Sequence, residues 1–297
     1  MTTITLGVPS GIGDISWVYS KLHCAPQEFD FEITVSDGWP HRSAEFCRLL
    51  PRVVKAEYQD FDYKDILVAQ KFNPITTFDD IVKYGLGRTM LSCNFHLESG
   101  KRLEKFLPDL DTDFHYPLKT TEEDALAAKE LIIASASAAP GDVLIGISAA
   151  SYRGSEAWDT WRAPKWNRFL DLLQEIANKR FRFVLLGGFW DDLTFALSKR
   201  PDAVEFVGKT TIAQAYEMQK LLDGYIGFSS GLGVLATLLS RPTVMLWPKH
   251  QVALSTSWAP PDMLKDKSYV ALQWDEPFEV VQQVEGWLKN HVLGGSS

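Results

Sequence analysis

Short apolar runs alternate with helical patterns along this chain, and turns of small residues separate them. The runs at 3–8 and 225–228 are rich in β-branched or aromatic residues, which is typical of buried strands. Between residues 15 and 22, apolar side chains recur at spacings of three and four, as on one face of a helix. This succession of strand, turn and helix predicts an α/β fold.

The second half of the chain repeats the same alternation. Its predicted strands are the apolar runs at 143–147, 181–186, 204–207, 225–228 and 243–247. A helix is expected over 164–177, because Pro164 suits a first helical turn and the apolar residues after it share one face. The chain should therefore contain two α/β halves.

A stretch of small residues marks the expected domain boundary. Residues 134–141 read Ala-Ser-Ala-Ser-Ala-Ala-Pro-Gly, the composition of a linker. We expect an N-terminal Rossmann-like domain over 1–138 and a second over 139–275. A helix over 276–293 would end the fold, with packing back on the N-terminal domain as one placement. Two domains of ordinary size fit in 297 residues and imply a cleft between them.

Composition excludes several classes of protein. The net charge is −8 with no basic run, so no broad surface for nucleic acid or anionic membrane is expected. No apolar run approaches the roughly 20 residues that span a bilayer. The N-terminus lacks the pattern of a signal peptide, and the three cysteines are odd in number and without ligand-like spacing. A cytoplasmic protein with reduced thiols is the simplest interpretation.

Two loops rich in small residues carry the candidate chemistry. The first contains Gly11 and Gly13 and places Asp14 at the start of a helix. A carboxylate there caps the helix and complements its dipole, or it serves as a catalytic group at the end of a parallel strand. Ser16 stands where a dinucleotide-binding motif has its third glycine, which argues against NAD.

The second loop, residues 229–233, reads Ser-Ser-Gly-Leu-Gly and joins a predicted strand to the helix at 234–239. Free N–H groups and the positive end of the helix dipole make such a junction an anion site. Its glycines would let a phosphate approach the backbone. The alternative is a tight turn with a structural role only.

Other candidates have plainer alternatives. Arg153 is either a clamp for a phosphate or a solvated loop charge, and Lys209 is more often a surface charge at a helix start. Trp161 could stack on a base or a sugar. His250 lies just past the strand at 243–247, but a surface histidine is the default. The acidic run at 109–113 could hold a divalent cation, yet a solvated turn is favoured and no metal is assigned.

The order of these segments resembles glycosyltransferase family 9, the heptosyltransferase-like enzymes. Gly11-Ile-Gly13-Asp14 looks like the family's N-terminal Gly-x-Gly-Asp. The similar segments of the second half are 145–149, 161–166, 185–188, 207–212 and 228–236. The resemblance covers the N-terminal loop and most of residues 141–250. It implies the GT-B fold, an α/β architecture of two facing Rossmann-like domains with a cleft between them.

Two positions depart from the family's pattern. Ser229 stands where the family has an aspartate, and Val234 where it has a histidine. Both belong to the loop that holds the donor phosphate, so a heptose donor is not assigned. The chain is placed as a divergent relative, with a phage origin as one option.

The resemblance implies an inverting transfer of sugar from a nucleotide-diphosphate donor to an acceptor hydroxyl, without a metal or cofactor. Asp14 matches the family's base and would take the acceptor's proton. Donors aimed at the leaving diphosphate would lower the barrier as its charge grows. The expected donor-binding residues are Gly11, Gly13, Ser148, Arg153, Gly187, Lys209, Ser229, Ser230, Gly231 and Leu232.

Rival functions remain open at this stage. The departures at Ser229 and Val234 suit an inactive protein that only binds a nucleotide sugar. A sugar-nucleotide epimerase or hydrolase on the same fold is another option. The acceptor could be a carbohydrate or, less in keeping with the charge of −8, a hydroxylated DNA base.

Overall fold

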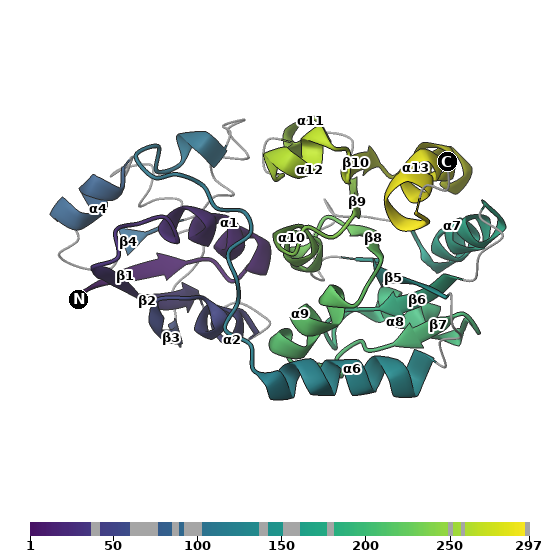
Figure 1. Cartoon of the computed structure of the whole chain (residues 1–297), viewed down its shortest axis with the longest axis horizontal. Coiled ribbons are helices and arrows are strands. Elements are labelled where there is room, and N and C mark those ends of the chain that lie inside the picture. The colour runs from purple at the N-terminus through teal and green to yellow at the C-terminus, as the bar shows by residue number, and fades with distance from the viewer. Residues whose placement is uncertain are drawn as a thin grey trace. The chain divides into compact units, whose positions relative to one another are not determined.

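The computed structural model of the chain describes residues 1–36, 42–59, 77–84, 89–91, 103–136, 142–150, 161–176, 181–248, 252–256 and 259–294. The chain divides into two compact units, Met1–Thr120 and Thr121–Ser297 (Figure 1). Each unit is an α/β structure with a parallel sheet, as predicted. None of the described helices has the length and apolar composition to cross a membrane.

The first unit is built on a four-stranded sheet in the order β3-β2-β1-β4. Its elements are β1 (Thr2–Val8), α1 (Ile12–Leu22), β2 (Phe29–Ser36), α2 (Arg42–Leu49), β3 (Val53–Gln59), α4 (Phe78–Tyr84), β4 (Thr89–Met90) and the 3-10 turn η1 (Leu103–Lys105). Strand β1 is central, with Leu6 paired to Ile33 of β2 on one side and to Thr89 of β4 on the other. The strand predicted at 3–8 and the helix predicted at 15–22 are both present.

The second unit holds a six-stranded sheet in the order β10-β9-β8-β5-β6-β7, parallel throughout. Its strands are β5 (Val143–Ser148), β6 (Phe181–Leu185), β7 (Ala203–Glu205), β8 (Gly224–Phe228), β9 (Thr243–Trp247) and β10 (Tyr269–Gln273). Its helices and helical turns are α6 (Glu122–Ala136), α7 (Ala163–Ile176), α8 (Asp192–Ala196), η3 (Leu197–Lys199), α9 (Ile212–Lys220), α10 (Gly231–Leu238), α11 (Val252–Ser255), α12 (Pro261–Lys265), α13 (Pro277–Trp287) and η5 (Leu288–Val292). From β5 the chain builds outward through β6 and β7, then crosses to β8 and builds outward on the other side. Strand order therefore reverses between β5 and β8, which makes this point the topological switch point of the sheet.

The boundary between the units lies earlier than the predicted one at 138/139. Helix α6 belongs to the second unit because its buried residues Ala128 and Ile132 share a core with Val204 of β7 and Met218 of α9. Figure 1 shows α6 running along α9, the helix with which it makes its main contact. Residues 134–136 of the predicted linker belong to α6, and residues 137–141 lie outside the described residues. The buried face of α6, which composition alone does not show, decides to which unit this helix belongs.

The C-terminal helix also differs from the placement considered on the N-terminal domain. Helix α13 packs against α7 in the second unit (Figure 1). Its residues Val284 and Trp287 join the core of Trp166 and Phe169. Trp287 Nε1 donates a hydrogen bond of 2.9 Å to the carbonyl of Ser268, just before β10. Helices thus cover both faces of the sheet, with α7 and α13 on one core and α6 and α9 on the other.

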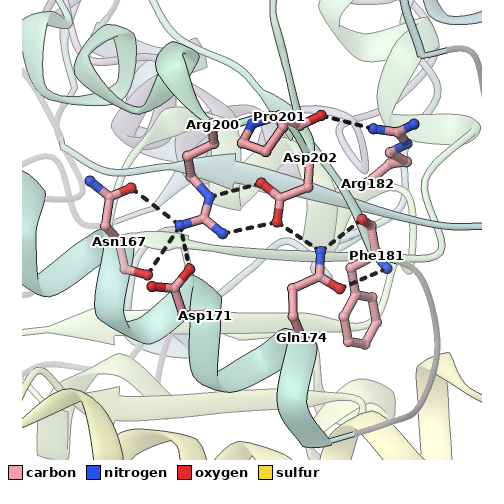
Figure 2. Close-up of polar contacts among 8 residues, drawn as sticks. All are labelled: Asn167, Asp171, Gln174, Phe181, Arg182, Arg200, Pro201 and Asp202. Atoms are coloured by element: carbon pink, nitrogen blue, oxygen red, sulfur yellow. Dashed lines mark hydrogen bonds and ion pairs between the residues drawn. The ribbon is translucent and has the colours of Figure 1, made fainter.

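A polar network ties α7 to the start of the outer strands β6 and β7 (Figure 2). Arg200 Nε and Nη2 each donate to the carboxylate of Asp202 at 2.9 Å, and Nη1 donates to Asp171 of α7 at 2.8 Å. Gln174 Nε2 donates to Asp202 and to the carbonyl of Phe181. Burial raises the pKa of Asp202, but the hydrogen bonds from Arg200 and Gln174 outweigh it and hold that pKa below its ordinary value. The network lies where β6 and β7 begin, at the opposite edge of the sheet from the strand ends described next.

Candidate functional site

The C-terminal ends of β5 and β8 meet at the switch point of the second unit. Ser148 pairs with Gly227, so the residues that follow both strands leave the same edge of the sheet side by side. A Cβ at Gly227 would lie 2.6 Å from Tyr225 Oη and 2.9 Å from the Ser148 carbonyl, a space that only glycine fits. In open parallel sheets, ligands bind outside the strand ends at such a reversal. The predicted site residues Ser148, Ser229 and Ser230 are therefore brought together.

Helix α10 begins immediately after this edge. The first bond of the helix runs from Val234 N to the Ser230 carbonyl, at 3.2 Å, so the N–H groups of Gly231 and Leu232 precede the helical ladder. Ser230 is the N-cap residue, yet its side chain makes no capping hydrogen bond. The hydroxyls of Ser229 and Ser230 are buried and find no hydrogen-bond partner within the described parts of the chain. The start of α10 thus offers backbone N–H groups and two hydroxyls that can donate hydrogen bonds to a ligand.

A third hydroxyl belongs to this edge. Tyr225 is fully buried on β8, and its Oη has no partner at hydrogen-bonding geometry among the described residues. Burial raises the pKa of Tyr225, and the nearby hydroxyls of Ser230 and Ser148 offset only part of that rise. A buried hydroxyl without a partner destabilises the fold by about 1–3 kcal/mol. A ligand with acceptor oxygens at the start of α10 would give the Ser229 and Ser230 hydroxyls the partners they lack.

The turn after β6 contains a buried carboxylate that the sequence did not single out. Asp191, 6% exposed, accepts hydrogen bonds from Thr194 N at 2.9 Å and from Thr194 Oγ1 at 2.7 Å. Thr194 Oγ1 in turn accepts a bond of 2.8 Å from the N–H of Ala149, the residue after β5. Burial raises the pKa of Asp191 to about 6, because its effect exceeds that of the Thr194 hydrogen bonds, which lower it. Gly187, a predicted site residue, lies against this carboxylate, since its Cβ would come within 2.8 Å of Asp191 Oδ2.

The end of β7 carries an exposed charge and a nearby aromatic ring. Lys209 Nζ lies 2.7 Å from Glu205 Oε2, and the lysine side chain is 60% exposed, which matches the surface-charge interpretation. Gly208 has a φ of +71°, and a Cβ there would meet Phe189 at 2.9 Å. The Phe189 ring is 61% exposed and contacts Trp190 edge-on at 4.9 Å. The exposure of Phe189 at this edge of the sheet was not predicted, because it depends on where the fold places the residue.

Three further residues were predicted as site candidates: Trp161, Arg153 and His250. Trp161 is buried, with its Nε1 donating to the Asp275 carbonyl at 2.7 Å and its ring against Trp166 and Phe169. Its surroundings are those of a core residue, so the structure gives no support to a stacking role. Arg153 and His250 lie outside the described residues.

The glycine loop of the first unit joins β1 to α1, which begins at Ile12, three residues before the predicted start at residue 15. Gly11 is the N-cap of α1, followed by the partly buried Gly13 and by Asp14, which is 3% exposed in the first helical turn. Ser43 Oγ of α2 donates to the Ser10 carbonyl and thereby secures the loop. Because β1 lies between β2 and β4, the loop leaves the central strand at the point where strand order reverses. Asp14 is thus a buried carboxylate at the place where ligands of such sheets bind.

The acidic run at 109–113 has structural contacts. Both carboxylate oxygens of Asp109 accept backbone N–H bonds at the start of α4, from Phe78 at 2.8 Å and Asp79 at 3.0 Å. Asp113 Oδ2 lies 3.4 Å from His23 Nε2. These contacts give Asp109 a structural role at the start of α4 and place Asp113 against His23.

Comparison with known proteins adds evidence on the fold. No protein-family model matches the chain, and no curated protein sequence matches it. The E. coli ADP-heptose lps heptosyltransferase II is similar in structure, with a TM-score of 0.65 over 100% of both chains and 14% identity. A glycosyl transferase family 9 protein from Veillonella parvula gives 0.62 and 13% identity, over 95% of this chain and 90% of that one. The E. coli heptosyltransferase WaaC with ADP gives 0.55 and 10% identity, over 95% and 99%.

These similarities confirm the predicted fold class. The chain has the GT-B, heptosyltransferase-like fold of glycosyltransferase family 9, with an α/β structure and parallel sheets. At 10–14% identity the likeness concerns the fold alone.

Proposed function

We propose that this protein is a glycosyltransferase that transfers a sugar from a nucleotide-diphosphate donor to an acceptor hydroxyl. The observation that carries the proposal is the group of donors at the α10 N-terminus: the N–H groups of Gly231 and Leu232, and the buried hydroxyls of Ser229 and Ser230, which make no hydrogen bond of standard geometry within the described residues. It lies at the switch point of a fold shared with glycosyltransferases. The donor nucleotide, the sugar and the acceptor are left unassigned.

The donor's diphosphate would bind at the start of α10. The N–H groups of Gly231 and Leu232 and the dipole of the eight-residue helix favour an anion there. The Ser229 and Ser230 hydroxyls would gain acceptor oxygens in place of the partners they lack. Because negative charge on the diphosphate grows as the glycosidic bond breaks, the same donors would stabilise the transition state more than the ground state.

The acceptor hydroxyl needs a base, and Asp14 is our assignment. In a single displacement the acceptor oxygen bonds to the anomeric carbon, the diphosphate leaves with the bonding electrons, and Asp14 takes the acceptor's proton. This course inverts the anomeric configuration and requires no metal. A carboxylate that is only 3% exposed is partly desolvated, as a general base requires.

The departures from the family pattern change how the donor is held. Val234, at the family's histidine position, is a buried residue of α10. Ser229 offers a neutral hydroxyl where the family has a carboxylate, so binding would rely on hydroxyl and N–H donors. This difference also favours one second candidate, a protein that binds nucleotide sugars without transferring them.

A thermal-shift screen with UDP-, GDP-, ADP- and CMP-sugars tests the proposal. A ligand at 100 times its Kd adds about 2.7 kcal/mol to the free energy of unfolding, so at least one nucleoside diphosphate sugar should raise the Tm by several degrees. Transfer is then measured with that donor and a panel of acceptors, with Asp14→Asn expected to abolish transfer and retain binding. Full transfer by Asp14→Asn would refute the base assignment.

The rival functions give other results in the same experiment. Binding without turnover, across all donors and acceptors, would identify a binding protein. Release of free sugar, or of an altered sugar nucleotide, without acceptor would identify a hydrolase or an epimerase. If none of the nucleotides binds, the proposed function is wrong.

A further inference from the structure

A hydrogen-bonded link joins the turn after β6 to the loop after β5. Its members are Asp191, Thr194 and the backbone N–H of Ala149, and all three residues are buried. Bonds of 2.7 and 2.8 Å connect them through the single hydroxyl of Thr194. The reaction proposed above uses none of these groups.

Helix capping explains only part of this arrangement. Asp191 Oδ1 accepts the Thr194 N–H, the ordinary bond of an N-cap residue, at the start of α8. Oδ2 is not needed for that cap, yet it accepts the Thr194 hydroxyl hydrogen and so turns the lone pairs of that oxygen toward Ala149. The carboxylate thereby sets the direction of a bond outside its own helix.

The bond reaches the edge where the diphosphate is proposed to bind. Ala149 directly follows Ser148, which pairs with Gly227 at the end of β8, next to the Ser229-Ser230 turn. Ser148 Oγ donates to the Ala150 carbonyl at 3.3 Å, so residues 148–150 form one hydrogen-bonded loop beside that turn. Fixing the Ala149 N–H therefore fixes the backbone that borders the phosphate position.

We infer that Asp191 and Thr194 are positioning residues for the donor, which act through Ala149 on the loop at 148–150. The inference rests on the proposed function and names the residues that hold one wall of its phosphate site. A structural cap alone would stabilise α8 and leave the donor's affinity unchanged. A positioning link changes the affinity through a hydroxyl that does not itself touch the donor.

The test is isothermal titration calorimetry of Thr194→Val with whichever of ADP, GDP or UDP binds the wild type most tightly. Loss of one oriented hydrogen bond should raise the Kd about 3- to 10-fold, and Thr194→Ser, which keeps the hydroxyl, should restore it. Hydrogen exchange at the Ala149 amide should accelerate in Thr194→Val and return to the wild-type rate in Thr194→Ser. Thr243→Val is the matched control, because its hydroxyl bonds to the Arg241 carbonyl before β9, at the other edge of the sheet.

The outcomes separate the two levels of the argument. An unchanged Kd for Thr194→Val, with tight wild-type binding, overturns the inference alone. Failure of all three diphosphates to bind the wild type overturns the proposed function, and the inference falls with it. If Thr194→Val does not fold, Asp191→Asn is tested in its place. The asparagine oxygen can still cap α8, but the amide nitrogen cannot accept the Thr194 hydroxyl hydrogen. An unchanged Kd in Asp191→Asn counts equally against the inference.

Discussion

Replacing Asp191 by asparagine should separate the stability of the second unit from its function. Burial raises the pKa of this carboxyl from 3.8 to about 6, so the folded protein binds its proton more tightly than the unfolded chain does. The free energy of unfolding therefore falls as the pH rises from about 4 to about 6, and the loss is complete above that range. At 1.36 kcal/mol for each pH unit, the loss amounts to about 3 kcal/mol.

Asp191→Asn lacks this titration. Its stability relative to wild type should increase by about 2 kcal/mol between pH 4.5 and pH 7.5, with most of the change below pH 6.5. Urea unfolding followed by tryptophan fluorescence measures it, because eight of the ten tryptophans lie in Thr121–Ser297. Asp192→Asn is the control, since it removes the same charge from the adjacent exposed residue.

A stability difference between Asp191→Asn and wild type that does not change with pH would refute this reasoning, as would one of opposite sign. The predicted result has a functional counterpart. The variant should be more stable than wild type at pH 7.5 while binding the diphosphate more weakly. A buried ionisable group that destabilises the fold is retained most readily where a site needs it.

Three further variants test other parts of the structure. Ser230→Ala should not lower the Tm, because this N-cap makes no capping bond and its buried hydroxyl has no partner within the described residues, whereas loss of a working cap costs about 1 kcal/mol. Its Kd for the donor should rise, and an unchanged Kd would count against the site. Gly227→Ala should lower the free energy of unfolding, measured with urea, by about 1–3 kcal/mol, because the added Cβ would overlap Tyr225 Oη and the Ser148 carbonyl. A variant as stable as wild type would contradict this close packing of the strand ends. Arg200→Leu should lower the free energy of unfolding by about 2–3 kcal/mol at pH 7 and by less at pH 3. The ion pair with Asp202 stabilises the fold above the unfolded pKa of that carboxyl, 3.8, and this stabilisation is lost as the pH falls through its lower pKa in the folded state. An equal loss at both pH values would contradict the ion pair.

Local patterns in the sequence predicted the elements and two of the loops. The runs at 225–228 and 243–247 are strands, and the small residues between them open α10, because these features depend on neighbours within a few positions. The likeness of several ordered segments to one family was also enough for the fold class.

What the sequence did not reveal depends on contacts between distant segments. In the sequence, Asp191-Asp192 before an apolar segment looks like an ordinary helix start. Asp191 gains its further role because Thr194 connects it by hydrogen bonds to Ala149, which lies 42 positions earlier in the chain. Trp161 looks like an available aromatic residue until the cores of α7 and α13 are formed around it. The unit to which α6 belongs depends likewise on which core receives Ala128.

Hydrogen–deuterium exchange of the backbone amides at 229–234, with and without a nucleoside diphosphate sugar, tests the central claim most directly. If the diphosphate binds at the start of α10, the amides of Gly231 and Leu232 should exchange more slowly in the complex, and Ser230→Ala should reduce that protection. A donor that binds with unchanged exchange in this segment would contradict the account.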